Sequence, residues 1–396
     1  MMRILTRYLL AELFVTFLLT LVVMTVFLFL VLIGKVAVDN GVGIIPLLRM
    51  IPYMLPQALQ FAVPGSMLLA TTSVYGRIAE ANELVAVKSL GISPMMMVWP
   101  TLIVATVVSF GAVVLNDVAV SWGHNGVKRV VFESLEEIVY GRLRMTRSYS
   151  SQQLKMNVKR VVGKKLIKPT ISFYASNGKP STTITADEAE FYTDLTLNTA
   201  TLSLYNAEVE IGSNASVFHP GHFELPIAFD DFSGQKGRSY SPANLPLKDI
   251  GPSVEKQEAE IDRIKQEMTA RASFALCTGR MFELSETSWQ PYRAQLLGAQ
   301  ARLNRLNVEP NRRWANGFSC LCFVMIGAPM AIRRQHGEFW GSFFACFLPI
   351  LIVYYPMLVG CVDAAKEGAV PPWGIWLGNL TLASWGVWLL RRVVRF

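Results

Sequence analysis

Long apolar runs constrain this chain more than any other feature of its sequence. Residues 11–33 are apolar except for Glu12, and a helix of about 20 residues crosses the ~30 Å hydrocarbon core of a bilayer. A cleaved signal peptide is the competing interpretation, but its apolar region is shorter and ends in a small-residue cleavage site, which does not occur before Gly34. Only 17% of residues are charged, against about 25% in soluble domains, so we predict a membrane protein.

The apolar segments predict six membrane-spanning helices, three on each side of a polar central region. Their approximate ranges are 11–33, 47–74, 95–115, 318–332, 342–362 and 375–390. The second segment is the least regular, because Arg49 and two glutamines interrupt it and three prolines are expected to kink or unwind it (Pro52, Pro56 and Pro64). Polar groups at membrane depth are tolerated where neighbouring helices or a cavity satisfy them, and Arg49 can snorkel to the interface.

The central region changes its sequence period twice. Alternating apolar and polar residues, separated by turn residues, predict strands at 169–175, 182–193, 195–211 and 223–229, and these favour a small antiparallel sandwich or roll. Helical patterns follow at 253–276 and 286–306, the first beginning at Pro252-Ser253. The expected domains are a first membrane block, a β-domain, a helical extension and a second membrane block, with boundaries at 1–115, 116–250, 251–313 and 314–396.

The basic residues of the short loops predict the orientation. In the six-helix topology they all fall on one side: Arg3, Arg7, Arg77, Lys88, Arg333, Arg334, Arg391, Arg392 and Arg395. By the positive-inside rule this side is cytoplasmic. Both termini are therefore expected in the cytoplasm, and the β-domain outside it, because long translocated domains are largely exempt from the rule.

Motifs for catalysis, nucleotide binding or metal binding are missing from the sequence. There is no G-x-x-x-x-G-K-[ST], H-E-x-x-H or G-x-S-x-G sequence and no cysteine pair at zinc spacing, so we expect no enzymatic activity and no cofactor or metal. His219 and His222 could share one turn, but nothing nearby completes a metal site, and their role stays open. Carboxylates are nearly absent from the apolar runs, which argues against an ion-coupled transporter. No run of basic residues interleaved with aromatics suggests nucleic-acid binding.

The polar segment 75–93 lies between two apolar segments and is predicted to be a cytoplasmic helix. Glu80, Glu83 and Val87 are three and four residues apart, a spacing that would place them on one helical face. Such an acidic and apolar stripe can insert into a groove on a soluble partner. The alternative is a helix that lies flat on the lipid surface, and the residues alone leave both interpretations open.

Residues 68–93, LLATTSVYGRIAEANELVAVKSLGIS, resemble the segment after the second span of the LptF/LptG family of lipopolysaccharide-export permeases. The matching residues are Leu68, Leu69, Ala70, Gly76, Arg77, Glu83, Leu84, Ala86, Gly91, Ile92 and Ser93. A second match, at residues 309–332, rests on Glu309, Arg313, Ala315, Gly327 and Pro329. Residues 186–191 look like a strand of the family's external β-jellyroll. The sequence departs from the family pattern at Gly317, where proline is common, at Asn311, where histidine is common, and in its longer helical extension.

The resemblance implies a permease subunit of an ABC transporter in the bacterial inner membrane. It would extract lipopolysaccharide or a similar glycolipid and pass it to a periplasmic jellyroll bridge protein, together with a paralogous permease subunit and a dimeric cytoplasmic ATPase. The residues expected to couple to the ATPase are Arg77, Glu80, Glu83, Leu84, Val87 and Gly91. Lys35 and Arg49 are candidate lipid contacts, and an ordinary interfacial role for Lys35 is equally compatible with the sequence. The shared motifs do not separate an F-like from a G-like subunit.

Two other functions are compatible with the composition. A permease of the FtsX or macrolide-exporter type also lacks its own ATPase, but its external domain follows the first of four spans, unlike the order here. A structural or sensor membrane protein could instead use the β-domain to bind a ligand without transport.

Overall fold

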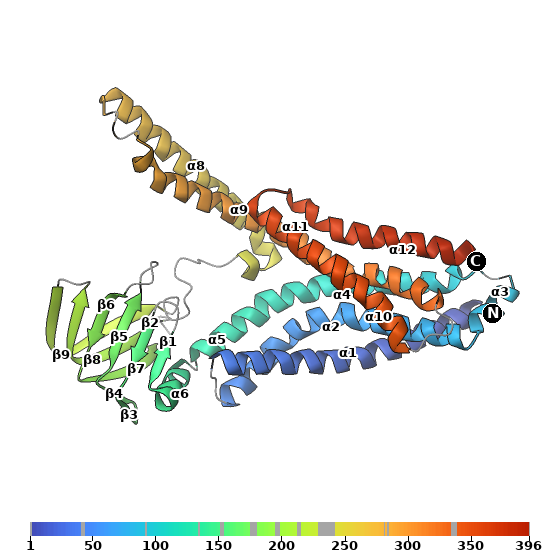
Figure 1. Ribbon diagram of the computed structural model, residues 1–396, viewed down its shortest axis with the longest axis horizontal. Helices are drawn as coiled ribbons and strands as arrows, with labels where there is room; N and C mark the ends of the chain where they lie inside the picture. Colours follow the sequence, from blue (N-terminus) through green and yellow to red (C-terminus); the bar gives the residue numbers. More distant parts are fainter. Residues whose placement is uncertain are drawn as a thin grey trace. The chain divides into compact units, whose positions relative to one another are not determined.

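The computed structural model describes residues 2–395 apart from 41–43, 92, 134, 151–153, 175–179, 195–198, 212–214, 229–241, 281, 283–284 and 334–338. Within these residues the chain is mainly helical and contains one antiparallel β-sheet (Figure 1). It divides into two compact units, of which the first comprises residues 1–29, 55–122 and 242–396 and the second residues 30–54 and 123–241. Arg334 and Ile92, which the sequence analysis used, lie outside the described residues.

The described helices follow the chain in this order (Figure 1). They are α1 (Met2–Asn40), α2 (Ile44–Glu80), α3 (Glu83–Ser89), α4 (Met95–Val118), the π-helix η1 (Ala119–His124), α5 (Asn125–Glu133), α6 (Leu135–Thr146), the 3-10 helix η2 (Pro242–Asn244), α8 (Leu247–Cys277), α9 (Glu286–Arg333), α10 (Phe339–Pro349), the π-helix η4 (Ile350–Tyr354), α11 (Tyr355–Glu367), the 3-10 helix η5 (Pro372–Trp376) and α12 (Leu377–Arg395).

Among the described residues, four helical segments are long and apolar enough to cross a membrane: Ile4–Val36, Met95–Gly123, Thr287–Arg333 and Phe343–Glu367. They contain four of the six predicted spans. The other two predicted spans lie in α2 and α12, which are helical but less apolar, so the count of six stays a prediction. Helix α2 runs through Pro52, Pro56 and Pro64 without a break, and the predicted unwinding is therefore wrong.

Helix α9 packs against α4 through a glycine. A Cβ on Gly317 would lie 3.0 Å from both the carbonyl oxygen of Ser109 and the amide nitrogen of Val113, closer than van der Waals contact allows. The two helices therefore approach backbone to backbone, and the amide of Leu321 donates a hydrogen bond to Ser109 Oγ at 3.2 Å. A side chain at position 317 would therefore need the neighbouring atoms of α4 to move.

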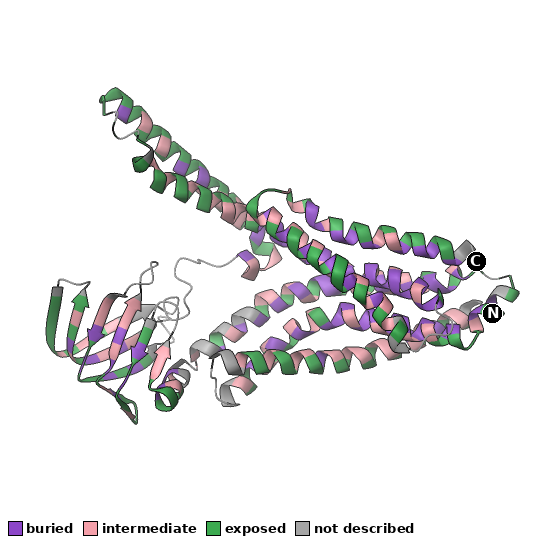
Figure 2. Ribbon diagram, viewed as in Figure 1, coloured by how far each residue is buried: buried purple, intermediate pink, exposed green. Residues whose placement is uncertain are grey.

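The helical extension consists of α8 and residues 286–313 of α9, together called the arm. Helix α8 begins at Leu247, before the predicted start at Pro252-Ser253. Helix α9 is one helix of 48 residues, so the predicted helix at 286–306 and the predicted span at 318–332 belong to a single element. Side chains of α8 and of residues 287–300 are mostly exposed, whereas those of residues 301–313 are mostly intermediate or buried (Figure 2).

The described part of the β-domain contains nine strands in one antiparallel sheet. They are β1 (Ser148–Ser150), β2 (Leu154–Asn157), β3 (Arg160–Val162), β4 (Lys165–Ile167), β5 (Thr170–Tyr174), β6 (Pro180–Thr185), β7 (Glu188–Asp194), β8 (Thr199–Ile211) and β9 (Ala215–Ala228). The order is β1-β2-β5-β6-β8-β7-β4-β3, with β9 paired to β8. The predicted strand at 182–193 is two strands that pair with successive parts of β8. Residues 125–133 and 135–146, within the predicted β-domain, are helical.

Helix α6 packs against the sheet and contributes to the hydrophobic core of the β-domain. Val139, Tyr140 and Leu143 are buried with apolar side chains from the strands, including Phe191 and Leu204. The Tyr140 hydroxyl accepts a hydrogen bond from the amide of Phe191 at 3.0 Å and donates to the carbonyl of Lys164. Burial raises the pKa of Tyr140. The phenol is thus a neutral link between α6 and the sheet.

We predict that Gly317→Ala loosens the α4–α9 crossing. The added methyl group must displace backbone atoms, and overpacking of this kind costs about 1–3 kcal/mol. Thermal unfolding of the purified protein in detergent should show a lower Tm. Gly111→Ala is the matched control on α4, since a Cβ there meets no atom within 4 Å, and it should keep or raise the Tm. An unchanged Tm for Gly317→Ala would contradict the predicted close approach.

Candidate functional site

The predicted coupling segment is two helices rather than one. Helix α2 ends at Glu80, and the chain turns at Asn82, whose φ is +53°. Asparagine tolerates this left-handed conformation better than most residues, which is why the helix can stop here. Helix α3 begins at Glu83, so Glu80 and Glu83 lie on different helices. The prediction that Glu80, Glu83 and Val87 share one helical face is therefore wrong.

Two side chains hold α3 against the chain's own helices. Leu84 is 1% exposed and Val87 9% exposed, and both belong to a cluster that includes Met97 and Val98 of α4. The same cluster takes in Ala331 and other residues near the end of α9. Leu84 and Val87 are therefore turned toward this unit rather than toward a partner.

The side of the segment that faces away from this cluster is exposed. Glu80 is exposed, Glu83 is half-buried in the first turn of α3, and Val85 and Leu90 are 48% and 64% exposed. Gly91 has a φ of +75°, so the turn between α3 and α4 needs the conformational freedom of glycine. This acidic and apolar surface is the part of the segment that a soluble partner could contact.

Two polar contacts fix the neighbouring helices at this end. Arg77, predicted as a coupling residue, lies on α2 and pairs with Glu12 of α1, with Tyr8 as a second hydrogen-bond partner at 3.2 Å. The fully buried Tyr75 hydroxyl contacts the carbonyl of Met97 at 2.9 Å and the hydroxyl of Thr101 at 2.7 Å, which joins α2 to α4. The role of Tyr75 cannot be predicted from its neighbours in the sequence, because its partners lie on another helix.

The remaining candidate residues occupy exposed positions. Lys35 and Arg49 are exposed on α1 and α2, and their role as lipid contacts stays a prediction. His219 and His222 are exposed on β9, where His222 contacts Ser203 Oγ at 2.7 Å and His219 stacks on Phe223. Among the described residues no group of three or more His, Cys, Asp or Glu side chains could hold a metal ion.

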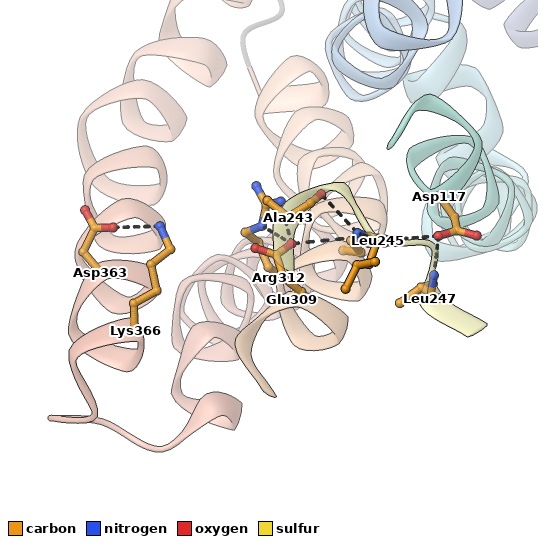
Figure 3. Close-up of polar contacts among 9 residues, drawn as sticks. Asp117, Ala243, Leu245, Leu247, Glu309, Arg312, Asp363 and Lys366 are labelled. Atoms are coloured by element: carbon orange, nitrogen blue, oxygen red, sulfur yellow. Dashed lines mark hydrogen bonds and ion pairs between the residues drawn. The ribbon is translucent and has the colours of Figure 1, made fainter. Parts of the chain in front are cut away.

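A polar junction forms at the end of α4 opposite α3. We use this name for Asp117, Arg313 and the segment 243–247 (Figure 3). Arg313 Nη1 donates to Asp117 Oδ1 at 2.7 Å, and Nη2 donates to the carbonyls of Ala243 and Leu245 at 3.3 and 2.6 Å. The same Asp117 oxygen accepts the amide of Leu247 at 2.8 Å. The junction thus joins α4, α9, η2 and the first residue of α8.

Burial makes the ion pair of the junction costly to break. The Arg313 side chain is 0% exposed and that of Asp117 is 29% exposed. A second carboxylate, on the buried Glu309, lies 3.9 Å from Arg313 Nε and also pairs with Arg312 at 2.7 Å. Removing one partner of a buried ion pair typically costs about 3–5 kcal/mol, because the other charge is left without compensation. The exposed pair Asp363–Lys366 on α11 lacks this burial and contributes little (Figure 3).

Only half of this junction could be predicted from the sequence. Glu309 and Arg313 match the family motif, whereas Asp117, a carboxylate directly after an apolar run, carries no local signal of a partner. Its partner lies 196 positions away, and only the fold brings the two together.

We predict that Leu84→Ala detaches α3 from the membrane helices. Truncating a buried leucine costs about 2–5 kcal/mol, and here the loss falls on a helix of only seven residues. Amide hydrogen exchange of residues 83–91 in the purified protein should become much faster. Val85→Ala is the matched control, since Val85 is half exposed and its truncation should leave the exchange rates unchanged. Equal acceleration in both variants would contradict the observed packing of α3.

The similarity to known proteins covers nearly the whole chain, including α3, the β-sheet and both sides of the polar junction. A family model described as "Lipopolysaccharide export system permease LptF/LptG" matches residues 7–392 of the 396. A search of curated proteins found no match. The family that the sequence analysis named is confirmed, and with it a membrane-embedded permease that carries a β-domain. The chain belongs to the LptF/LptG family of lipopolysaccharide export permeases.

Proposed function

We propose that this chain is a transmembrane subunit of an ABC transporter that extracts lipopolysaccharide, or a similar glycolipid, from the bacterial inner membrane. The family match supports the substrate class. The observation that carries the mechanism is α3, a short helix fixed by buried Leu84 and Val87 with an open acidic and apolar surface on its other side. Such an element can receive force from a soluble motor without moving independently of the membrane helices.

Energy input is physically necessary for this transport. Each CH₂ group buried in a bilayer contributes about 0.8 kcal/mol to retention, so a lipid with several acyl chains does not leave unaided. The sequence has no nucleotide-binding motif, and we assign ATP hydrolysis to a separate dimeric cytoplasmic ATPase. We further propose a paralogous permease as the second membrane subunit, with lipid entering laterally between the two.

The proposed topology has six spans, with both termini and α3 in the cytoplasm and the β-domain and arm in the periplasm. The distribution of basic residues in the short loops supports this orientation. The β-domain would pass lipid to a periplasmic bridge protein with a similar jellyroll, by pairing of exposed strand edges. Lys35 is proposed to meet a lipid phosphate at the outer end of α1, and Arg49 to lie near it on α2.

We predict that Glu83→Arg separates the ATPase from the membrane complex. A cation at the first turn of α3 opposes the helix dipole and reverses the charge of the proposed docking surface. Co-purification from detergent extracts should recover the chain at normal levels with at least about tenfold less ATPase, the loss expected for one reversed charge pair.

The matched control for this experiment is Glu258→Arg, which reverses an exposed carboxylate on the arm. It should leave co-purification unchanged. If the wild-type chain recovers no ATPase, or Glu83→Arg retains it fully, the transporter proposal loses its main support, and a structural or sensor role becomes the better explanation.

A further inference from the structure

Helix α4 connects the proposed motor-docking element directly to the polar junction. Its 24 residues correspond to about 36 Å, and no break interrupts it between Met95 and Val118. At one end, Leu84 and Val87 of α3 belong to the same buried cluster as Met97 and Val98 of its first turn. A displacement of α3 is therefore expected to disturb the start of α4.

At its other end α4 presents Asp117. One carboxylate oxygen accepts hydrogen bonds from Arg313 at 2.7 Å and from the amide of Leu247 at 2.8 Å. Pro246, the residue before α8, offers no capping side chain, so Asp117 satisfies a free amide of the α8 N-terminus from another helix. The positive end of the α8 dipole also favours a carboxylate at this position.

Arg313 extends the connection to the chain that returns from the β-domain. Its Nη2 donates to two carbonyls, those of Ala243 and Leu245, just after the last strand-bearing part of the chain. The guanidinium is completely buried, so these bonds are not weakened by competing water. The close approach at Gly317 keeps α4 and α9 together beside the junction.

We propose that Asp117 and Arg313 are positioning residues that transmit movement of α4 to segment 243–247 and to the base of the arm. This role rests on the proposed function and deepens it: the ATPase acts on α3, α4 carries the displacement across the membrane, and the junction delivers it to the extracytoplasmic elements. The pair contacts neither lipid nor nucleotide. Its loss uncouples ATP hydrolysis from export without preventing either the docking of the ATPase or the binding of lipid.

The first test measures lipopolysaccharide export per ATP hydrolysed by the complete complex in proteoliposomes. Asp117→Asn keeps the shape of the side chain and removes its charge, and it should lower this ratio about tenfold while ATP hydrolysis persists. The double variant Asp117→Asn/Arg313→Gln leaves no unpaired buried charge, which protects folding, and it should show the same loss. Asp363→Asn removes the exposed pair with Lys366 and should keep the wild-type ratio.

The outcomes of this test separate coupling from structure. A wild-type ratio in Asp117→Asn overturns the proposal. The proposal is also overturned if export and ATP hydrolysis both fall in proportion to the amount of assembled complex, because a purely structural pair would have that effect. If the wild-type complex exports no lipid, the proposed function is wrong. The connection between α3 and the junction is then tested on the isolated chain by hydrogen exchange.

The second test uses hydrogen exchange on the full chain in detergent and needs no transport. Leu84→Ala, which releases α3, should accelerate exchange of the amides in residues 242–250, and Val85→Ala should not. In the Asp117→Asn background, Leu84→Ala should add no further acceleration, because the connection is already broken. Unchanged exchange at 242–250 in Leu84→Ala, or full additivity of the two substitutions, overturns the proposal.

Discussion

In the first compact unit, the buried guanidinium of Arg313 places the strictest requirement on which segments must meet. A buried cation must find anionic and carbonyl acceptors inside the protein, because water does not reach it. The end of α4 supplies a hydrogen-bonding carboxylate, Asp117, the chain before α8 supplies two carbonyls, and Glu309 of α9 lies 3.9 Å from Arg313 Nε. Satisfying one side chain therefore fixes three segments that lie far apart in the sequence. The glycine at position 317, one turn further along α9, removes the side chain that would keep α4 too distant for the pair to form.

The existence of the membrane helices could be predicted from sequence because hydrocarbon allows few alternatives to a helix. The ends of these helices could not be predicted, because hydropathy indicates the environment of a segment and not where its helical hydrogen bonds end. Helix α2 continues past the apolar residues to Glu80, and α9 begins at Glu286, well before its apolar part. In the β-domain the alternation of apolar residues located β5 and β8 closely. It did not show that a bend at Ala186 and Asp187 divides one predicted strand into β6 and β7.

At the candidate site too, features set by neighbouring residues could be predicted from the sequence, and contacts between distant residues could not. The segment 75–93 was predicted to be one polar helix, whereas residues 75–80 belong to α2 and residues 83–89 form α3. The face that the segment presents was not predicted correctly, because a single left-handed residue, Asn82, changes the direction of the chain between the two glutamates. Asp117 was missed for the opposite reason: nothing in its neighbourhood indicates a partner almost two hundred residues away. Spacing rules describe one helix at a time, whereas both errors concern how one helix meets another.

Because α9 is one continuous helix, its membrane part and the arm are connected through the residues of the junction. Residues 286–313 extend about 40 Å beyond Arg313, and residues 314–333 cover about 30 Å, the thickness of the hydrocarbon core. Because the two parts are one helix, a change in tilt within the membrane swings the end of the arm. A tilt of about 10° would move that end by roughly 7 Å, from the rise of 1.5 Å per residue. Helix α8, bonded to Asp117 at Leu247 and packed along α9, must follow this movement or slide against it. Arg313 lies where the two parts meet, so the hydrogen bonds of the junction connect α4 and segment 243–247 to the start of the arm.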